Sequence, residues 1–196
     1  MAWLRRSSLR SVSLLAAIPI SVLGAFVFSR VTSSGGGESD AVLTDPGEYV
    51  EPGASTNPPL AVDALPGVQL FAADGAPVEL VSDGRPMVVN LWYSTCPPCA
   101  RELVDFAAVH HEIGDAVRFV GVNPYDSAAD MATFADDRDV TYELLRDPDS
   151  ELADALGVVA YPVTLFVGRD GYVVEQTGPL AANELRARLA RYWAIG

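Results

Sequence analysis

Two cysteines, Cys96 and Cys99, are the residues of this chain whose type and spacing best suit chemistry. They stand in the run Cys96-Pro97-Pro98-Cys99, directly after a predicted central strand and at the start of a predicted helix. Two intervening residues on a first helical turn bring both sulfurs within bonding reach, and the positive end of the helix dipole stabilises a thiolate on Cys96. The spacing predicts a redox-active dithiol, with Cys96 as the exposed nucleophile and Cys99 as the less exposed resolving thiol.

Two other interpretations of the cysteine pair stay open. A structural disulfide is compatible with the spacing, although so short a ring stabilises a fold little compared with a long loop. A metal site would need more ligands, and His110 and His111 lie about three turns further along the same helix, too far to share a metal with both thiols. We interpret the histidines as a surface or packing pair, and we expect neither a metal nor a cofactor.

The elements that must position the cysteines follow from the apolar pattern. Residues 87–92 are a nearly continuous apolar run, as in a central strand covered on both faces. A helix with apolar spacing follows Pro97 and Pro98. Strands are also expected at 118–122, 141–145, 163–167 and 172–176, helices at 127–137, 150–156 and 182–193, and an N-terminal β-hairpin from 68–71 and 78–80. The order predicts an α/β fold with a mixed central sheet flanked by helices, an N-terminal hairpin and a central αβ insertion.

Charge divides the 196 residues into two unlike regions. The net charge is −13, from 13 basic residues, all arginine, and 26 acidic residues. Four arginines precede Glu38, the first acidic residue, so the remainder holds nine arginines against all 26 acids. Nucleic acid is a poor candidate partner, because binding its backbone needs a basic surface.

An uncharged apolar stretch follows the first arginines and has about the length of a membrane-spanning helix. We expect a basic cytoplasmic segment at 1–10, a transmembrane signal-anchor at 11–31, a flexible linker rich in Gly, Ser and Pro at 32–66, and a folded domain at 67–196. A cleaved signal peptide is the alternative for the apolar stretch, although no clean small-x-small cleavage pattern follows it. Arginines before the stretch and acids after it place the folded domain outside the cell membrane.

Three stretches of the predicted domain carry a family resemblance: MVVNLWYSTCPPCARE, FVGVNPYDS and LGVVAYPVTLFVGRDGYVV. With them, the chain from Gly67 onward resembles the membrane-anchored, thioredoxin-like thiol-disulfide oxidoreductases of the TlpA/ResA/CcmG type. The resemblance implies a thioredoxin fold. It also implies that Cys96 and Cys99 alternate between a disulfide and a dithiol.

The resemblance assigns substrate binding to residues around the cysteines. It implies a cis bond between Tyr161 and Pro162 facing the disulfide, with backbone groups of Tyr161 pairing with an incoming extended chain. An ordinary trans proline at a strand edge is the alternative. The family commonly has Trp immediately before the first cysteine, where this chain has Thr95; Trp92 stands three residues earlier. We place Trp92 and Thr95 with the substrate-binding residues, and this departure bears on substrate preference.

Glu102 completes the family pattern C-x-x-C-x-x-E. The resemblance makes it a buried catalytic acid that raises thiol pKa values and assists proton transfer, where cytosolic thioredoxin uses an Asp on the central strand. That neighbourhood offers Asn90 here. A solvated helix glutamate paired with Arg101 is the alternative.

These features predict an extracytoplasmic enzyme that reduces protein disulfides. By resemblance, its electrons come from a membrane thiol reductase of the CcdA/DsbD type, and apocytochrome c is a candidate substrate. The alternatives are a DsbA-like oxidase that forms disulfides in secreted proteins and a non-enzymatic copper-binding thiol module, for which the C-x-x-x-C spacing is missing. A peroxidase would need Pro-x-x-x-Thr-x-x-Cys, which is also missing.

Overall fold

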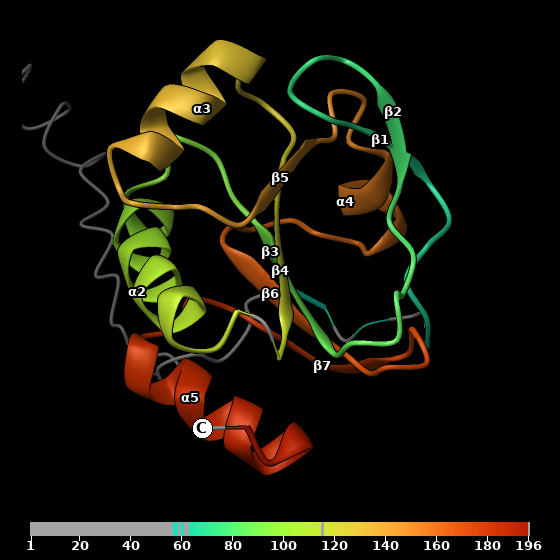
Figure 1. The fold of residues 1–196 in the computed structure, drawn as a ribbon. Coiled ribbons are helices and arrows are strands. Elements are labelled where there is room, and N and C mark those ends of the chain that lie inside the picture. Colours follow the sequence, from blue (N-terminus) through green and yellow to red (C-terminus); the bar gives the residue numbers. More distant parts are fainter. Residues whose placement is uncertain (1–56, 59, 61–62, 115, 196) are drawn as a thin grey trace, which may run out of the picture. The chain divides into compact units, whose positions relative to one another are not determined.

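The computed structural model describes residues 57, 58, 60, 63–114 and 116–195. These residues form a seven-stranded mixed sheet with the order β2-β1-β5-β4-β3-β6-β7, flanked by helices (Figure 1). The thioredoxin-like α/β fold expected from the sequence is confirmed. The elements are β1 (Gln69–Phe71), β2 (Pro77–Glu79), β3 (Met87–Leu91), α2 (Pro97–Ile113), β4 (Arg118–Asn123), α3 (Ala128–Asp136), β5 (Glu143–Arg146), α4 (Glu151–Ala155), β6 (Val163–Val167), β7 (Val173–Thr177) and α5 (Ala182–Trp193).

Strand β3, which leads to the cysteines, lies in the interior of the sheet between β4 and β6. It pairs in parallel with β4 and antiparallel with β6, and all five of its residues are buried. Strand β5 continues the parallel part beside β4, while β7 pairs antiparallel with β6. The hairpin of β1 and β2 joins the sheet through β5. A strand buried on both faces holds the following loop and the start of α2 in a fixed place.

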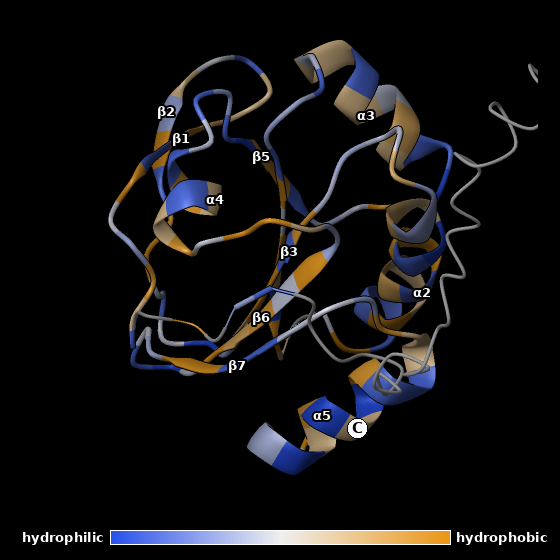
Figure 2. Ribbon diagram, turned by 180° about the vertical axis from the view of Figure 1, so that it is seen from behind, coloured by the Kyte–Doolittle hydropathy of each residue, from blue (hydrophilic) through white to orange (hydrophobic). Residues whose placement is uncertain are grey.

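Helices cover the two faces of the sheet unequally. On one face, side chains of α2, α3 and α5 pack with Val88 and Phe166 in one hydrophobic cluster. On the other face, Leu152 and Leu156, in and just after α4, pack with Val89 and the other inward residues of the strands. Figure 2 shows the hydrophobic colour concentrated in strands such as β6, while α5 carries much hydrophilic colour. Because successive side chains of a strand point to opposite faces, the sheet has one hydrophobic core on each face.

Both edges of the sheet are covered or short. Strand β2 has three residues and begins with Pro77, which has no N–H to offer. Beside the start of β7, Ala64 forms an antiparallel bridge with Tyr172, and the N–H of Val173 donates to the carbonyl of Asp63 at 2.8 Å. The predicted start of the folded domain at Gly67 is therefore too late, because residues assigned to the linker already hydrogen-bond to the sheet.

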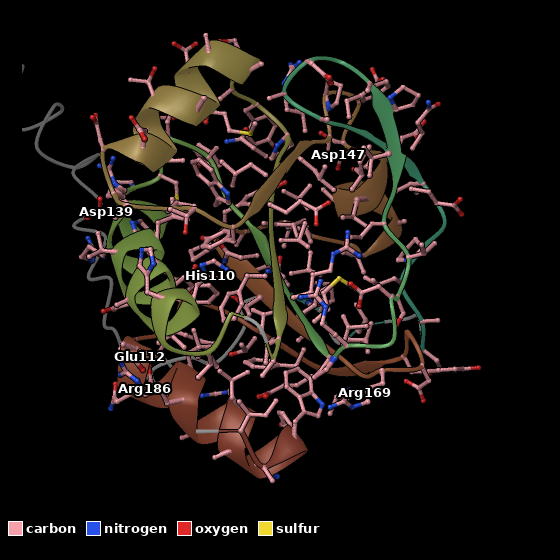
Figure 3. The ribbon with its side chains drawn as sticks, viewed as in Figure 1. His110, Glu112, Asp139, Asp147, Arg169 and Arg186 are labelled. Atoms are coloured by element: carbon pink, nitrogen blue, oxygen red, sulfur yellow. A yellow bond between two sulfur atoms is a disulfide. The ribbon has the colours of Figure 1, made fainter. Side chains whose placement is uncertain are left out.

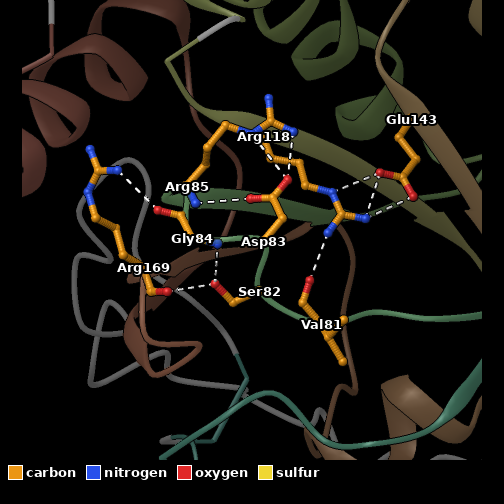
Figure 4. Close-up of polar contacts among 8 residues, drawn as sticks. All are labelled: Val81, Ser82, Asp83, Gly84, Arg85, Arg118, Glu143 and Arg169. Atoms are coloured by element: carbon orange, nitrogen blue, oxygen red, sulfur yellow. Dashed lines mark hydrogen bonds and ion pairs between the residues drawn. The ribbon is translucent and has the colours of Figure 1, made fainter.

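The loop between β2 and β3 is fastened at the end of the sheet opposite the cysteines (Figure 4). The Ser82 hydroxyl donates to the carbonyl of Arg169 at 2.6 Å, in the turn between β6 and β7. Arg118, at the start of β4, donates to the carbonyl of Val81 at 2.8 Å and forms a two-pronged ion pair with Glu143. These contacts fix the entry of the chain into β3.

The predicted basic segment 1–10 and transmembrane segment 11–31 lie outside the described residues. Within the part of the chain that the structure describes, no helix has the length and apolar character needed to cross a membrane.

Candidate active site

The two cysteines form a disulfide at the N-terminus of α2. Their Cα atoms lie 5.2 Å apart. Cys96 is the N-cap of the helix, and its sulfur accepts the N–H of Cys99 at 3.3 Å. Pro97 and Pro98 occupy the first two helical positions, where no N–H is needed. A thiolate formed at Cys96 on reduction would thus have a donor and the positive helix end beside it.

Both cysteines are buried in the disulfide form. Cys99 is fully buried, as expected, but Cys96 is only 3% exposed. The prediction of an exposed Cys96 is therefore wrong for this form. Cys96 belongs to the hydrophobic cluster beneath α2, and the partly buried rings of Tyr93 and Tyr161 pack against that cluster. The exposed positions are its neighbours Thr95 and Pro97.

Glu102 is a buried acid one helical turn after Cys99. Its side chain is 2% exposed and accepts hydrogen bonds from the amide of Asn90 and the N–H of Leu180, both at 2.8 Å. The Asn90 amide also donates to Thr164 at 3.2 Å. Burial raises the pKa of Glu102 to about 8, although the hydrogen bonds from Leu180 and Asn90 oppose that rise. Glu102 is therefore not the solvated residue paired with Arg101, and with a pKa of about 8 it holds its proton through neutral pH.

A cavity of about 340 Å³ borders Glu102 between the start of α2 and the loop before α5. Pro98, Arg101, Asp105, Leu180 and Glu184 are among the residues that line it. The cavity therefore lies against the turn of α2 that carries Glu102.

Three tyrosines from three different loops meet beside the disulfide. The Tyr161–Pro162 bond is cis, and the ring of Tyr161 lies edge-on to Tyr93 at 5.4 Å and to Tyr125 at 5.7 Å. Tyr93 and Tyr125 are 5.2 Å apart. The carbonyl of Tyr93 accepts the N–H of Cys96 at 3.3 Å, so the group is tied to the redox site. Tyr125 is 62% exposed and offers an aromatic surface that the sequence did not predict.

The expected role of Trp92 in substrate contact is wrong. Trp92 is fully buried and stacks on Phe134 with 5.7 Å between ring centres. It follows β3, and its side chain points into the core beneath α2 and α3. From there it supports the fold of the site but does not reach a substrate, whereas Thr95 is exposed as substrate contact would require.

Asp126 is a positioning residue that sequence reasoning missed. Its carboxylate accepts hydrogen bonds from the N–H and the hydroxyl of Ser94, both at 2.7 Å, and from the amide of Asn123 at 2.6 Å. These contacts bind the loop before Cys96 to the loop that follows β4. The signal was present in the sequence, because Asn and Asp directly after a strand commonly cap turns.

The two histidines lie away from the cysteines. His110 packs edge-on against Phe119 and Tyr142, while His111 contacts the carbonyl of Asp139 at 3.1 Å. Nearby, Glu112 of α2 pairs with Arg186 of α5 at 2.6 Å (Figure 3). Among the described residues, no three His, Cys, Asp or Glu side chains gather so as to hold a metal ion.

Comparisons with known proteins agree with this geometry. Thiol-disulfide oxidoreductase ResA of Bacillus subtilis is 29% identical over 113 residues, covering 56% of this chain and 62% of ResA. A Mycobacterium tuberculosis protein named as a candidate peroxiredoxin is 30% identical over 139 residues, 64% of this chain and 85% of that protein. The solved structure of M. tuberculosis dsbF matches with a TM-score of 0.58 and 27% identity, covering 67% of this chain and 98% of that one.

The family model described as AhpC/TSA family matches residues 62–176. That span includes the cysteine pair, the buried Glu102 and the Tyr161–Pro162 bond, and it exceeds half of the chain. The relatives named as thiol-disulfide oxidoreductases agree with the expected class of enzyme. The chain therefore belongs to the AhpC/TSA family and has its thioredoxin-like fold.

Proposed function

We propose that this protein is a thiol-disulfide oxidoreductase that reduces disulfides in other proteins outside the cell membrane. The observation that carries the proposal is the Cys96–Cys99 disulfide at a helix N-terminus, one turn from the buried acid Glu102. Residues 11–31 would anchor the chain, as the apolar stretch after the N-terminal arginines suggests.

The first step belongs to Cys96 in the reduced protein. Its thiolate attacks one sulfur of the substrate disulfide, so that a bond forms between Cys96 and the substrate while the second substrate sulfur leaves as a thiolate. The N–H of Cys99, which points at the Cys96 sulfur, favours the thiolate before the attack. The exposed Thr95 and the tyrosine group border the place where the substrate chain must lie.

The second step needs a proton acceptor for Cys99. Glu102 takes the proton of the Cys99 thiol, directly or through a water molecule, and the resulting thiolate attacks the Cys96 sulfur. The Cys96–Cys99 disulfide forms, and the substrate leaves as a dithiol after uptake of protons. Two electrons pass from the enzyme to the substrate. A pKa of about 8 suits Glu102 to accept and return a proton near neutral pH.

A dithiol donor must then restore reduced Cys96 and Cys99. We propose a membrane thiol reductase of the CcdA/DsbD type as donor, and general protein disulfides or apocytochrome c as acceptor. The similarity to ResA, which is named a thiol-disulfide oxidoreductase, supports the exchange chemistry, and the reduction potential below tests its direction. A peroxidase role is disfavoured by the residues before Cys96, because Val89 and Tyr93 stand where the peroxidase pattern needs Pro and Thr.

Two measurements test the proposal. A Cys99→Ser variant in its reduced form should accumulate mixed disulfides with substrate proteins, while Cys96→Ser should accumulate none. The reduction potential of the Cys96–Cys99 couple decides the direction: a value well below about −120 mV, the potential of a strong oxidant, supports a reductase. A value close to it would instead support a DsbA-like oxidase.

A further inference from the structure

The side chain of Asn57 binds the backbone just before Pro162, although about a hundred residues separate them in the sequence. The Oδ1 atom accepts the N–H of Val159 at 2.6 Å and that of Ala160 at 2.8 Å, and the Nδ2 atom donates to the carbonyl of Ala160 at 2.9 Å. Asn57 is only 9% exposed. A residue predicted to lie in the flexible linker thus makes a three-bond contact with the redox domain.

These bonds give the N–H groups of Val159 and Ala160 an acceptor that the neighbouring helix and strand do not provide. The N–H groups of Gly157 and Val158 donate to carbonyls of Asp154 and Ala153, at the end of α4. Strand β6 begins only at Val163. Between these elements, the N–H groups of Val159 and Ala160 reach neither helix nor sheet, and Asn57 is the acceptor that both share. Backbone donors near the core need such a partner to hold one conformation.

The segment that Asn57 holds leads directly into the redox site. Tyr161 follows Ala160, and its ring packs against Tyr93, whose carbonyl binds the N–H of Cys96. The side chain of Val159, in contrast, is 75% exposed. The segment is therefore fixed near Cys96 at Tyr161, while the side chain of Val159 points to solvent. A surface that binds another chain needs both a fixed backbone and exposed side chains.

We propose that Asn57 is a positioning residue for substrate binding: it holds residues 159–161 in the conformation that receives a substrate chain beside Cys96. The inference rests on the proposed function. It assigns to a residue of the predicted linker a role in recognising protein substrates. The redox chemistry of the cysteines themselves does not depend on Asn57.

The test compares Asn57→Ala with a matched control, Gln176→Ala. The Gln176 side chain donates to the carbonyl of Pro58 at 3.5 Å. Gln176→Ala therefore removes a contact to the same N-terminal segment and leaves residues 159–161 unaltered. Each full-length variant is assayed with insulin as a protein disulfide and with 5,5′-dithiobis(2-nitrobenzoate) as a small disulfide. For Asn57→Ala, which removes all three bonds, we expect the KM for insulin to rise about three- to tenfold, the net value of about one hydrogen bond, with kcat within about twofold.

Three further readouts should separate positioning from general folding. The rate with the small disulfide and the Cys96–Cys99 reduction potential should stay at wild-type values in Asn57→Ala. Amide hydrogen exchange at Val159 and Ala160 should accelerate in Asn57→Ala but not in Gln176→Ala. Asn57→Asp retains an acceptor for both N–H groups but loses the donor to Ala160, so its KM for insulin should lie between those of wild type and Asn57→Ala. If Asn57→Ala does not fold, Asn57→Asp replaces it in the comparison.

Distinct results would overturn the two proposals. An unchanged insulin KM in Asn57→Ala and Asn57→Asp, or an equal rise in Gln176→Ala, would refute the role of Asn57. A parallel loss of activity on both disulfides would also refute it, because that pattern indicates a purely structural residue. If the wild-type protein reduces neither disulfide, the proposed function fails, and the exchange rates at Val159 and Ala160 still decide whether Asn57 holds the segment.

Discussion

Replacing Glu102 by Gln should make the protein more stable at alkaline pH, although a buried hydrogen-bonding group is altered. The folded state holds the Glu102 proton up to a pKa of about 8, whereas the ordinary value is 4.5. Between these pH values the folded protein binds more protons than the unfolded chain, so the wild-type free energy of unfolding must fall as pH rises. One pKa unit corresponds to about 1.4 kcal/mol, so the loss from this group reaches about 3 kcal/mol at pH 7.

Gln removes the charge but keeps the shape. Its carbonyl can accept the N–H of Leu180, and rotation of the Asn90 amide can turn Oδ1, which has no partner in the described structure, toward the new NH₂ group. Urea denaturation of the oxidised full-length protein at pH 5, 6, 7 and 8 measures the effect. The difference in free energy of unfolding between variant and wild type should grow by about 3 kcal/mol over this range.

The comparison isolates Glu102 from other acids. Burial also raises the pKa of Asp147, which adds a slope of the same sign, but that slope is common to both proteins and cancels in the difference. If the two curves run parallel from pH 5 to pH 8, Glu102 is not the group that holds a proton in the folded state. Its assigned role in deprotonating Cys99 would then lose its physical basis.

Other variants test the supporting contacts. Asp126→Ala leaves the Ser94 N–H and the Asn123 amide without their acceptor and should cost about 2–3 kcal/mol of stability in urea denaturation; a wild-type midpoint would contradict the clamp between the two loops. Trp92→Phe keeps a buried ring and should leave the KM for insulin unchanged, and a clear rise would restore Trp92 to substrate contact. Gly121→Ala would place a Cβ 2.8 Å from the Trp92 ring nitrogen and should lower the free energy of unfolding by about 1–3 kcal/mol. A lower thermal midpoint would show this loss, whereas a wild-type midpoint would mean that the Trp92 ring moves aside without cost.

Local patterns predicted much of the fold. Helix α5 has the expected bounds, Ala182–Trp193, because its amphipathic spacing is complete within the segment. Strand β6 and its turn to β7 were predicted for a similar reason, and Gly171 has the positive φ that such a turn requires. In the site, the family pattern predicted a buried acid at Glu102, and the structure buries this side chain one helical turn after Cys99.

The missed features depend on contacts between distant segments. No local pattern distinguishes a fully buried Trp92 from one at the surface, since the answer depends on where Phe134 of α3 packs. The burial of Cys96 likewise follows from rings contributed by other loops. Asn57 lies in a stretch rich in Pro and small residues, which is typical of a linker, and its partners are about a hundred residues away.

The closed edges of the sheet bear on how this protein behaves when crowded. An exposed edge strand is a template on which a second molecule can add, and such addition begins aggregation. Here the first strand is short and starts with Pro77, while the segment at Asp63–Leu65 pairs with the chain entering β7. A protein proposed to offer backbone groups to extended chains next to its disulfide thus leaves little free edge on its own sheet, which restricts one route to aggregation.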